Sequence, residues 1–361
     1  MSDAVRRHYE LYPYPSYPLL ASVPLCDTYA LNLTALWTMF NGVLPPEGAQ
    51  RILIAGCGSF APYPFALANP DSMITALDLS ARSIRRARLH CLLHGCRNVN
   101  FQAGDLLDPT VVAERFGLID AYGVLHHLDN PLAGLKALAA RLTDGGILRI
   151  MVYSRYARIE EESVRRVFRL LRVKDPVAAE RLIKRSKSGS RLRRFADASD
   201  EINFKSGLAD ALLHPCVHTF RIDGLMEIVR QTGLAPLLFA HNGALQDVGL
   251  EIERIRQMEV DKRSPGNFIL YLGRNTSGAC TDDTGSLIMI NPCLQSVAGN
   301  FQIGTKNIPS RLGQPNPPIG RLERKFLRRF LKPVPWDAIK PESRSTASVF
   351  NKALFLLRYR Q

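Results

Sequence analysis

Two glycines and an aspartate in the first quarter of the chain have the types and spacing of a nucleoside-binding site. Gly56 and Gly58 follow a short apolar run that begins at Ile52, and Asp78 ends a second apolar run. Because glycine has no Cβ, the backbone at such positions can turn tightly and approach a ligand. A carboxylate at the end of the second strand can accept hydrogen bonds from two ribose hydroxyls. The pattern therefore predicts a cofactor that contains a nucleoside.

The glycines alone do not identify the nucleoside, but the segments that follow discriminate better. The run from Gly56 to Ala61 also fits the dinucleotide pattern G-x-G-x-x-G/A, and a single match of this kind is weak. A third predicted strand, from residue 97, ends at Gly104 and Asp105, where a carboxylate can accept a hydrogen bond from an adenine amino group. The next features in chain order are a strand at 116–122, the loop Val124-Leu125-His126-His127, a turn at 142–146 and a strand at 147–153.

This ordered set of motifs resembles the set found in class I S-adenosylmethionine-dependent methyltransferases, over roughly residues 50–155. The resemblance implies an α/β fold with a Rossmann-like, seven-stranded sheet, completed by an antiparallel pair near 235–241 and 267–273. It also implies S-adenosyl-L-methionine as the cofactor. The chain departs from many members at Ser59 and Phe60, because another small residue often follows the second glycine. The residues that the resemblance assigns to the cofactor are Gly56, Cys57, Gly58, Asp78, Leu79, Asp105, Leu106, Val124 and Leu125.

His126 and His127 are the candidate catalytic residues. Methyl transfer is a direct in-line displacement, for which the protein must bring a nucleophile to about 3 Å from the methyl group and exclude water. A base is required only where the nucleophile arrives protonated, and imidazole titrates near neutral pH. The alternative interpretation is that both histidines are structural, as is common in the family that the chain resembles.

The N-terminal segment alternates tyrosine with proline from Tyr12 to Pro18. Proline restricts the backbone to extended conformations, which predicts a stiff strap over residues 5–18. Its candidate substrate-binding residues are Tyr9, Tyr12 and Tyr14, which would stack on a ligand or close the cofactor cleft. The alternative is that the strap packs on the core and its hydroxyls reach solvent.

A second group of candidate substrate-binding residues follows the fifth strand. Together with the N-terminal segment, residues 151–158 and 210–220 resemble a poorly characterised bacterial subgroup of methyltransferases. The resemblance implies a substrate-side wall made of Tyr153, Arg158, Asp210, His214 and His218. The alternative is a capped helix boundary with ordinary histidines.

Residues 156–210 are rich in arginine and lysine, and apolar residues recur there at helical spacing. This pattern predicts two amphipathic helices inserted into the methyltransferase domain as a basic lid. The formal net charge of +14 favours anionic partners by long-range attraction. A solvated basic face is the alternative. RNA stays open as a partner, although no recognised nucleic-acid-reading motif accompanies the charge.

Composition divides the chain into three parts. Residues 1–45 form the tyrosine- and proline-rich strap, 46–274 the methyltransferase domain with its insertion, and 275–361 a C-terminal extension with coil and small helices. Within the extension, 275–320 is predicted to be coil, followed by a basic amphipathic helix near 321–332 and a final helix near 345–358. The basic helix would dock onto the core, or contact an anionic membrane surface or RNA.

The remaining features set outer limits. No apolar run approaches the roughly 20 residues of a membrane span, and the first residues lack the apolar core of a signal peptide. The seven cysteines form no Cys-x-x-Cys pair, so neither a disulfide framework nor a zinc site is predicted. We therefore expect a reduced, cytoplasmic protein without a bound metal.

Three functions are consistent with these patterns. The first is an S-adenosylmethionine-dependent methyltransferase that acts on an anionic, small-molecule or polymer-borne acceptor. The alternatives are a non-catalytic methyltransferase fold that binds RNA or serves in assembly, and an NAD-dependent oxidoreductase. The ordered motifs favour the first, the basic surface keeps the second open, and the glycine pattern supports the third.

Overall fold

The computed structural model describes residues 3–281, 284–299 and 304–360, and its centre is a seven-stranded sheet in the order β3-β2-β1-β4-β5-β7-β6. The strands are β1 (Arg51–Ala55), β2 (Met73–Asp78), β3 (Val99–Ala103), β4 (Phe116–Tyr122), β5 (Leu142–Val152), β6 (Ala235–Phe239) and β7 (Phe268–Gly273). The first five strands are parallel, and β7 is antiparallel to both β5 and β6. The prediction of a Rossmann-like α/β sheet with an antiparallel last pair is confirmed.

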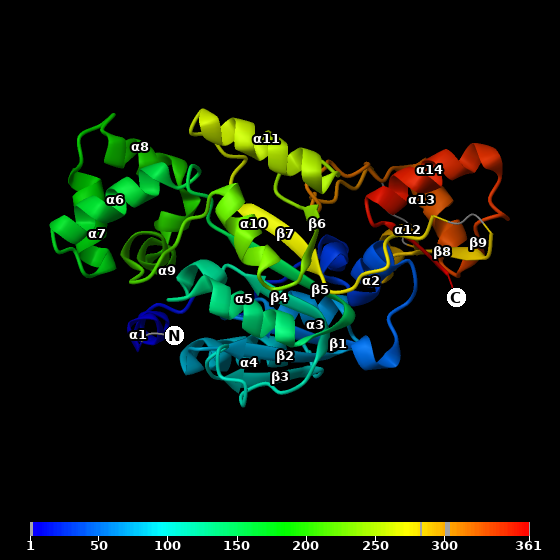
Figure 1. The fold of residues 1–361 in the computed structure, drawn as a ribbon, viewed down its shortest axis with the longest axis horizontal. Helices are drawn as coiled ribbons and strands as arrows, with labels where there is room; N and C mark the ends of the chain where they lie inside the picture. The colour runs from blue at the N-terminus through cyan, green and yellow to red at the C-terminus, as the bar shows by residue number, and fades with distance from the viewer. Residues whose placement is uncertain (1–2, 282–283, 300–303, 361) are drawn as a thin grey trace.

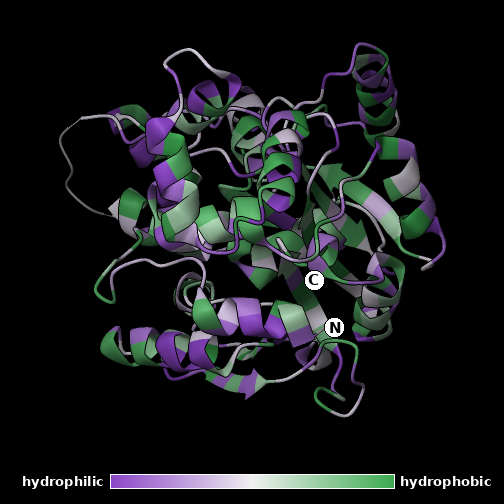
Figure 2. Ribbon diagram, turned by 90° about the vertical axis from the view of Figure 1, so that its left-hand side faces the viewer, coloured by the Kyte–Doolittle hydropathy of each residue, from purple (hydrophilic) through white to green (hydrophobic). Residues whose placement is uncertain are grey.

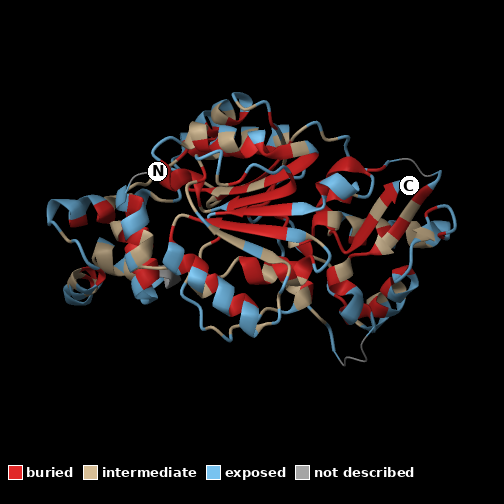
Figure 3. Cartoon of the chain, turned by 90° about the horizontal axis from the view of Figure 1, so that it is seen from below, coloured by how far each residue is buried: buried red, intermediate tan, exposed pale blue. Residues whose placement is uncertain are grey.

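Helices cover both faces of the sheet (Figures 1 and 3), so its inner strands are buried on both sides. Because successive side chains of a strand point to opposite faces, Ile52 and Ile54 of β1 belong to one core cluster, and Leu53 and Ala55 belong to the other. This two-sided burial explains the near-continuous apolar runs of the sequence. The covering helices are α2 (Leu33–Asn41), α3 (Pro62–Ala68) and α4 (Ala81–Leu93) for the first cluster, and α5 (Pro131–Ala140), α10 (Ile222–Arg230) and α11 (Val248–Val260) for the second.

The N-terminal segment begins as a helix, α1 (Asp3–Leu11), and only then becomes irregular. The prediction of an extended strap over residues 5–18 is therefore wrong for its first half. The physical reason is that the prolines begin at Pro13, so they end the helix but do not prevent it. The chain then forms a 3-10 helix, η1 (Leu25–Leu31), before α2.

The basic insertion contains more helices than the two that were predicted. They are α6 (Ile159–Leu170), α7 (Pro176–Arg185), α8 (Arg191–Ala198), η4 (Asp200–Asn203), α9 (Lys205–Leu208) and the π-helical turn η5 (Ala209–Leu213). The side chains of Asp175 and Ser190 cap α7 and α8, and these two helix starts were missed in the sequence. Figure 2, in which the insertion faces the viewer, shows hydrophobic and hydrophilic residues alternating along its helices.

The C-terminal extension is a second, three-stranded sheet with helices, not a coil followed by helices. Its strands are β8 (Ser286–Ile290), β9 (Val334–Pro335) and β10 (Leu356–Arg360), in the order β10-β8-β9. The predicted coil over 275–320 contains β8, and the predicted final helix ends at Lys352, because Leu354 adopts a left-handed backbone with φ 61° and the chain continues as β10. The helices are η6 (Pro292–Leu294), α12 (Gln295–Gly299), α13 (Arg321–Leu327), η7 (Arg328–Phe330) and α14 (Pro341–Lys352).

Tyr29 of η1 joins the extension to the main sheet layer. Its ring packs against that of Phe355, with centroids 5.4 Å apart. Its hydroxyl accepts hydrogen bonds from the Arg311 N–H at 3.0 Å and from Asn316 Nδ2 at 2.9 Å, and Asn291 Nδ2 donates to the Tyr29 carbonyl at 3.1 Å. One apolar cluster therefore continues from β1 into the extension.

Within the described residues, no helix is both long enough and apolar enough to span a membrane.

The shared core predicts that the extension and the methyltransferase domain unfold together. Phe355 is fully buried, so Phe355→Ala is expected to lower the free energy of unfolding by about 3–5 kcal/mol. Chemical denaturation followed by both fluorescence and circular dichroism should show one transition, shifted in the variant. Val349→Ala is the control, since Val349 on α14 is half exposed and its loss should change stability by less than about 0.5 kcal/mol. Two separate transitions, with only one shifted, would contradict the shared core.

Candidate functional site

A cavity of about 450 Å³ opens at the carboxyl ends of β1, β2 and β4. This edge of a parallel sheet is where ligands bind in open α/β folds. The cavity is lined by the loop after β1, by residues at the carboxyl ends of β2, β3, β4 and β5, by the N-terminal segment and by the turn η5. The basic helices α6 to α8 contribute no lining residue among those described, so the predicted basic lid is replaced by the N-terminal segment.

In the loop after β1, Gly56 packs closely against Val124, and Gly58 packs closely against Tyr14. Gly56 and Gly58 have φ values of 70° and 55°, a region that other residues rarely adopt. A Cβ on Gly56 would lie 2.4 Å from Cγ2 of Val124, and one on Gly58 would lie 2.5 Å from the carbonyl oxygen of Tyr14. Both positions therefore require glycine, for conformation and for space.

Asp78 lies at the end of β2, where its carboxylate connects two loops. Oδ2 accepts a hydrogen bond from the Gly58 N–H at 2.7 Å, and Oδ1 accepts one from the Ser80 N–H at 2.9 Å. Burial raises the pKa of Asp78 to about 6, although the N–H groups of Ser80 and Gly58 act in the opposite direction. Each oxygen has a second lone pair that can accept from a ribose hydroxyl.

The other predicted cofactor residues divide into two groups. Cys57, Leu79, Leu106 and Val124 line the cavity together with the glycines and Asp78. Asp105 and Leu125 are outside the lining. The Asp105 carboxylate accepts a hydrogen bond from the Leu107 N–H at 2.9 Å, and Leu125 is buried in the core cluster beneath α5.

The two histidines after β4 occupy different environments. His127 lines the cavity, and its Nδ1 lies 2.9 Å from the carbonyl oxygen of Cys216. Because a carbonyl can only accept, Nδ1 carries the proton and Nε2 has a free lone pair. Burial lowers the pKa of His127 to about 3, so the ring is neutral at physiological pH. His126 is fully buried behind the cavity, stacked on Tyr153 with ring centroids 3.7 Å apart.

The N-terminal segment forms one wall of the cavity through Val5, Tyr9, Tyr14, Pro15 and Tyr17. Of the predicted tyrosines, Tyr9 and Tyr14 line the cavity, whereas Tyr12 does not. Backbone hydrogen bonds attach this segment to the cofactor loops: the Ser59 N–H donates to the Tyr14 carbonyl at 3.2 Å, and Ser80 Oγ donates to the Tyr9 carbonyl at 3.3 Å.

Phe60, the departure from the family pattern, also lines the cavity. Its ring contacts Tyr17 at 4.6 Å and His90 at 5.1 Å between centroids. Phe60 therefore packs between the N-terminal segment and α4.

The predicted substrate-side wall is brought together only in part. Tyr153 and Asp210 line the cavity, and Tyr9 Oη donates to Asp210 Oδ1 at 3.0 Å. Asp210 belongs to the π-helical turn η5, a conformation that is frequent at functional sites. Arg158 and His214 lie behind these residues: the Arg158 guanidinium stacks over Tyr153 at 3.9 Å, and the His214 ring packs on His127 at 3.8 Å. His218 makes a backbone hydrogen bond to the His126 carbonyl and is outside the lining.

Three lining residues with charged or amide side chains were missed in the sequence. Asp120 and Arg149 face each other across β4 and β5, with Nε 2.5 Å from Oδ1. Charged residues are rare inside buried strands, so Asp120 and Arg149 could have been singled out in their apolar runs. Asn267, which accepts a hydrogen bond from Arg158 Nε at 3.1 Å, lies just before β7, and no pattern marks it.

Comparison with known proteins agrees with this geometry. Residues 53–148 match a family described as a methyltransferase domain. An uncharacterised protein of Synechococcus sp. is 29% identical over 301 residues, which cover 76% of this chain and 72% of that protein. The ubiquinone biosynthesis O-methyltransferase of Xanthomonas axonopodis pv. citri is 33% identical over 138 residues, 37% of this chain and 55% of that enzyme. PKMT2 from Rickettsia typhi in complex with AdoHcy shares the fold with a TM-score of 0.54, at 15% identity, over 93% of this chain and 72% of that one.

The strand order and the position of the cavity define a class I methyltransferase fold. Residues 53–148 match a methyltransferase domain, and this match together with the fold supports S-adenosyl-L-methionine as the cofactor. The residues present fit this cofactor, because Gly56 and Gly58 line the cavity and Asp78 offers it a buried carboxylate. The antiparallel β7 between β5 and β6 differs from the six-stranded dinucleotide-binding order and does not favour the oxidoreductase alternative.

Gly58→Ala is expected to weaken AdoHcy binding at least about tenfold, or 1.4 kcal/mol. The new methyl group would collide with the Tyr14 carbonyl and push the N-terminal segment off the loop. Calorimetric titration with AdoHcy measures the affinity, and limited proteolysis measures exposure of the segment.

Gly95→Ala is the matched control, since Gly95 has φ 72° but nothing within 4 Å of a Cβ. Both variants carry the backbone penalty of about 1–2 kcal/mol for a left-handed residue, but only Gly58→Ala should lose affinity. Equal affinity losses in the two variants would contradict the contact with Tyr14.

The raised pKa of Asp78 predicts a pH dependence of cofactor binding. Donors such as ribose hydroxyls favour the ionised carboxylate, so the affinity should fall as pH drops through about 6. At pH 5 we expect AdoHcy to bind about tenfold more weakly than at pH 7. Asp78→Asn should bind weakly at both values. If the wild-type protein binds AdoHcy equally well at pH 7 and pH 5, Asp78 does not bind the ribose.

Proposed function

We propose that the enzyme methylates a hydroxyl oxygen of a small-molecule acceptor held in the cavity, with His127 accepting the hydroxyl proton. The observation that carries the proposal is the hydrogen bond from His127 Nδ1–H to the Cys216 carbonyl at 2.9 Å. It leaves Nε2 as an acceptor on a residue that lines the cavity. A protonated nucleophile needs such an acceptor within hydrogen-bond reach. Because the pKa of His127 is only about 3, the proton would move to Nε2 as the oxygen–methyl bond forms, when the hydroxyl becomes far more acidic.

The cofactor would occupy the end of the cavity next to β1 and β2. Gly56, Cys57 and Gly58 would contact its methionine part, and Asp78 with Leu79 its ribose. Leu106 and Val124 would flank the adenine, whereas Asp105 and Leu125 would support this wall from outside the lining. When bound, the cofactor supplies a methyl group on a positively charged sulfonium, which needs no further activation.

The acceptor would occupy the other end, between Tyr9, His127, Tyr153 and Asp210. Asp210 is held by the Tyr9 hydroxyl at 3.0 Å, so its carboxylate can orient a polar group of the acceptor. The N-terminal segment covers both ends of the cavity and would exclude water during the displacement. The O-methyltransferase relative supports oxygen as the methylated atom.

The other partners considered from the sequence receive less support. An anionic partner or RNA would contact the exposed basic helices α6 to α8, which are outside the cavity lining among the described residues. Peripheral membrane contact through 321–332 would depend on the exposed Leu322 and Leu331, because Leu327 and Phe330 are buried. A cytoplasmic location stays part of the proposal, supported by seven free thiols.

His127→Gln is expected to lower kcat for a hydroxyl acceptor by about 10²–10⁴-fold, while AdoHcy affinity is retained. The assay follows a labelled methyl group from S-adenosylmethionine to matched phenols and anilines. His94→Gln, on a histidine outside the cavity lining, should retain the full rate. Transfer to the anilines but not to the phenols, or an undiminished rate in His127→Gln, would contradict the proposal.

A further inference from the structure

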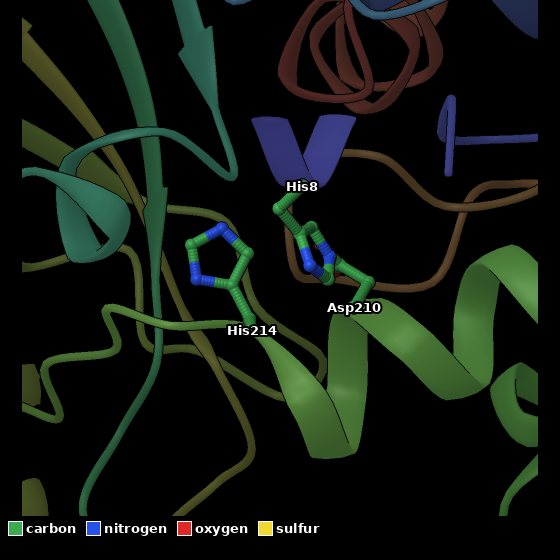
Figure 4. Close-up of side chains that lie close together, drawn as sticks. All are labelled: His8, Asp210 and His214. Atoms are coloured by element: carbon green, nitrogen blue, oxygen red, sulfur yellow. The ribbon is translucent and has the colours of Figure 1, made fainter. Parts of the chain in front are cut away.

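Three buried side chains form a cluster beside the cavity: His8 of α1, Asp210 of η5 and His214. The proposed reaction gives a role to Asp210 but none to the cluster as a whole. Figure 4 shows them gathered between α1 and η5, and one donor atom from each lies within 4.8 Å of the others. Two imidazoles and a carboxylate are a common ligand set for a divalent transition metal. The hydrogen bonds of His214 decide whether this set is available.

His214 is held in the wrong tautomer for a metal ligand. Its Nδ1 accepts a hydrogen bond from the Cys216 N–H at 3.1 Å, so in the neutral ring the proton is on Nε2. A metal-bound histidine needs its lone pair on the ligating nitrogen and donates from the other one. His214 Nε2 has no hydrogen-bond partner among the described residues, but it is a donor. The cluster therefore does not carry a metal proposal.

The backbone of Cys216 makes hydrogen bonds to two histidine rings, one through its N–H and one through its carbonyl. The Cys216 carbonyl accepts from His127 Nδ1–H at 2.9 Å, and the Cys216 N–H donates to His214 Nδ1. One residue therefore fixes two neighbouring imidazoles in opposite tautomers. The two rings are 3.8 Å apart between centroids and inclined by 35°.

From this arrangement we infer that His214 is a positioning residue for His127, acting through the backbone of Cys216. The inference rests on the proposed function, in which His127 accepts the proton. The His214 side chain bonds to the N–H two residues ahead, which is the geometry of a local side-chain turn. Pro215 between them has a fixed φ and stiffens the turn. The turn holds the Cys216 carbonyl where His127 Nδ1–H needs an acceptor.

Charges around the turn are arranged so that both imidazoles stay neutral. Arg165 Nη2 donates to the His214 carbonyl at 2.8 Å, and its Nε lies 3.5 Å from a Glu162 carboxylate oxygen. Burial lowers the pKa of His214 and that of His8, the latter to about 4. The His8 ring packs on His214 with centroids 4.8 Å apart. Docking of α1 therefore buries the positioning residue.

The test compares His214→Ala with His214→Asn in the full-length protein. The Asn amide oxygen can occupy the place of Nδ1 and accept from the Cys216 N–H, whereas alanine cannot. We expect kcat for the phenol acceptor to fall by about 10–100-fold in His214→Ala and to recover to within about threefold in His214→Asn. AdoHcy affinity should stay at the wild-type value in both variants. His94→Ala is the control and should retain the wild-type rate.

A spectroscopic readout separates positioning from general loss of structure. Long-range ¹H–¹⁵N spectra of ¹⁵N-histidine-labelled protein distinguish protonated from unprotonated ring nitrogens, and His127→Gln assigns the His127 signals. We expect His127 with the proton on Nδ1 in the wild type and in His214→Asn, and a mixture of tautomers in His214→Ala. A single Nδ1–H tautomer together with a full rate in His214→Ala would overturn the inference.

The two proposals fail in different ways. An undiminished rate in His127→Gln would show that His127 is not the proton acceptor, whichever tautomers the spectra show. If His214→Ala has the wild-type rate and His127→Gln is slow, His127 keeps its role as the base and His214 loses its positioning role. A slow His214→Asn variant whose His127 tautomer is unchanged from wild type would also overturn the inference, because the restored hydrogen bond would then have no effect on the reaction.

Discussion

The buried carboxylate of Asp78 is the interaction on which the site depends. It accepts from the N–H groups of Gly58 and Ser80, so a single side chain connects the loop after β1 to the start of α4. Ser80 in turn caps α4 through its hydroxyl and donates to the Tyr9 carbonyl of the N-terminal segment. Holding this charge out of water is costly, as its pKa of about 6 shows. Hydrogen bonds from ribose hydroxyls would offset part of that cost.

The N-terminal segment gives the two ends of the cavity a common wall. At one end, the Tyr14 carbonyl lies where a side chain on Gly58 would be, so glycine is needed for contact with this segment as well as for contact with a cofactor. At the other end, Tyr9 donates a hydrogen bond to Asp210, and His8 packs on His214. One segment of the chain, residues 5–17, therefore touches the loop that would hold the cofactor and the turn that would hold the acceptor. Displacement of this whole segment would open both ends together.

The sequence was informative where local patterns determine structure. Apolar runs that end in Gly56 or Asp78 predict buried parallel strands with ligands at their carboxyl ends, and the sheet has that form. Prediction failed where tertiary packing overrides local composition. Residues 5–11 were predicted as part of a proline-rich strap but form a helix, because the prolines begin only at Pro13 and α1 packs with Val5 in the cavity wall. The strand β8 was hidden in a segment rich in turn-forming residues, and it is stable only because β9 and β10 pair with it.

The arrangement around Cys216 shows a further limit of sequence patterns. His127 and His214 are 87 residues apart, and nothing in their spacing indicates that one peptide backbone holds both. A sequence can supply the right residue types for a base or a metal ligand, but the tautomer of each ring depends on which backbone group it meets. Here a carbonyl meets His127 and an N–H meets His214. The same two histidines with those partners exchanged would present a donor to the cavity, and the hydroxyl proton would have no acceptor at His127.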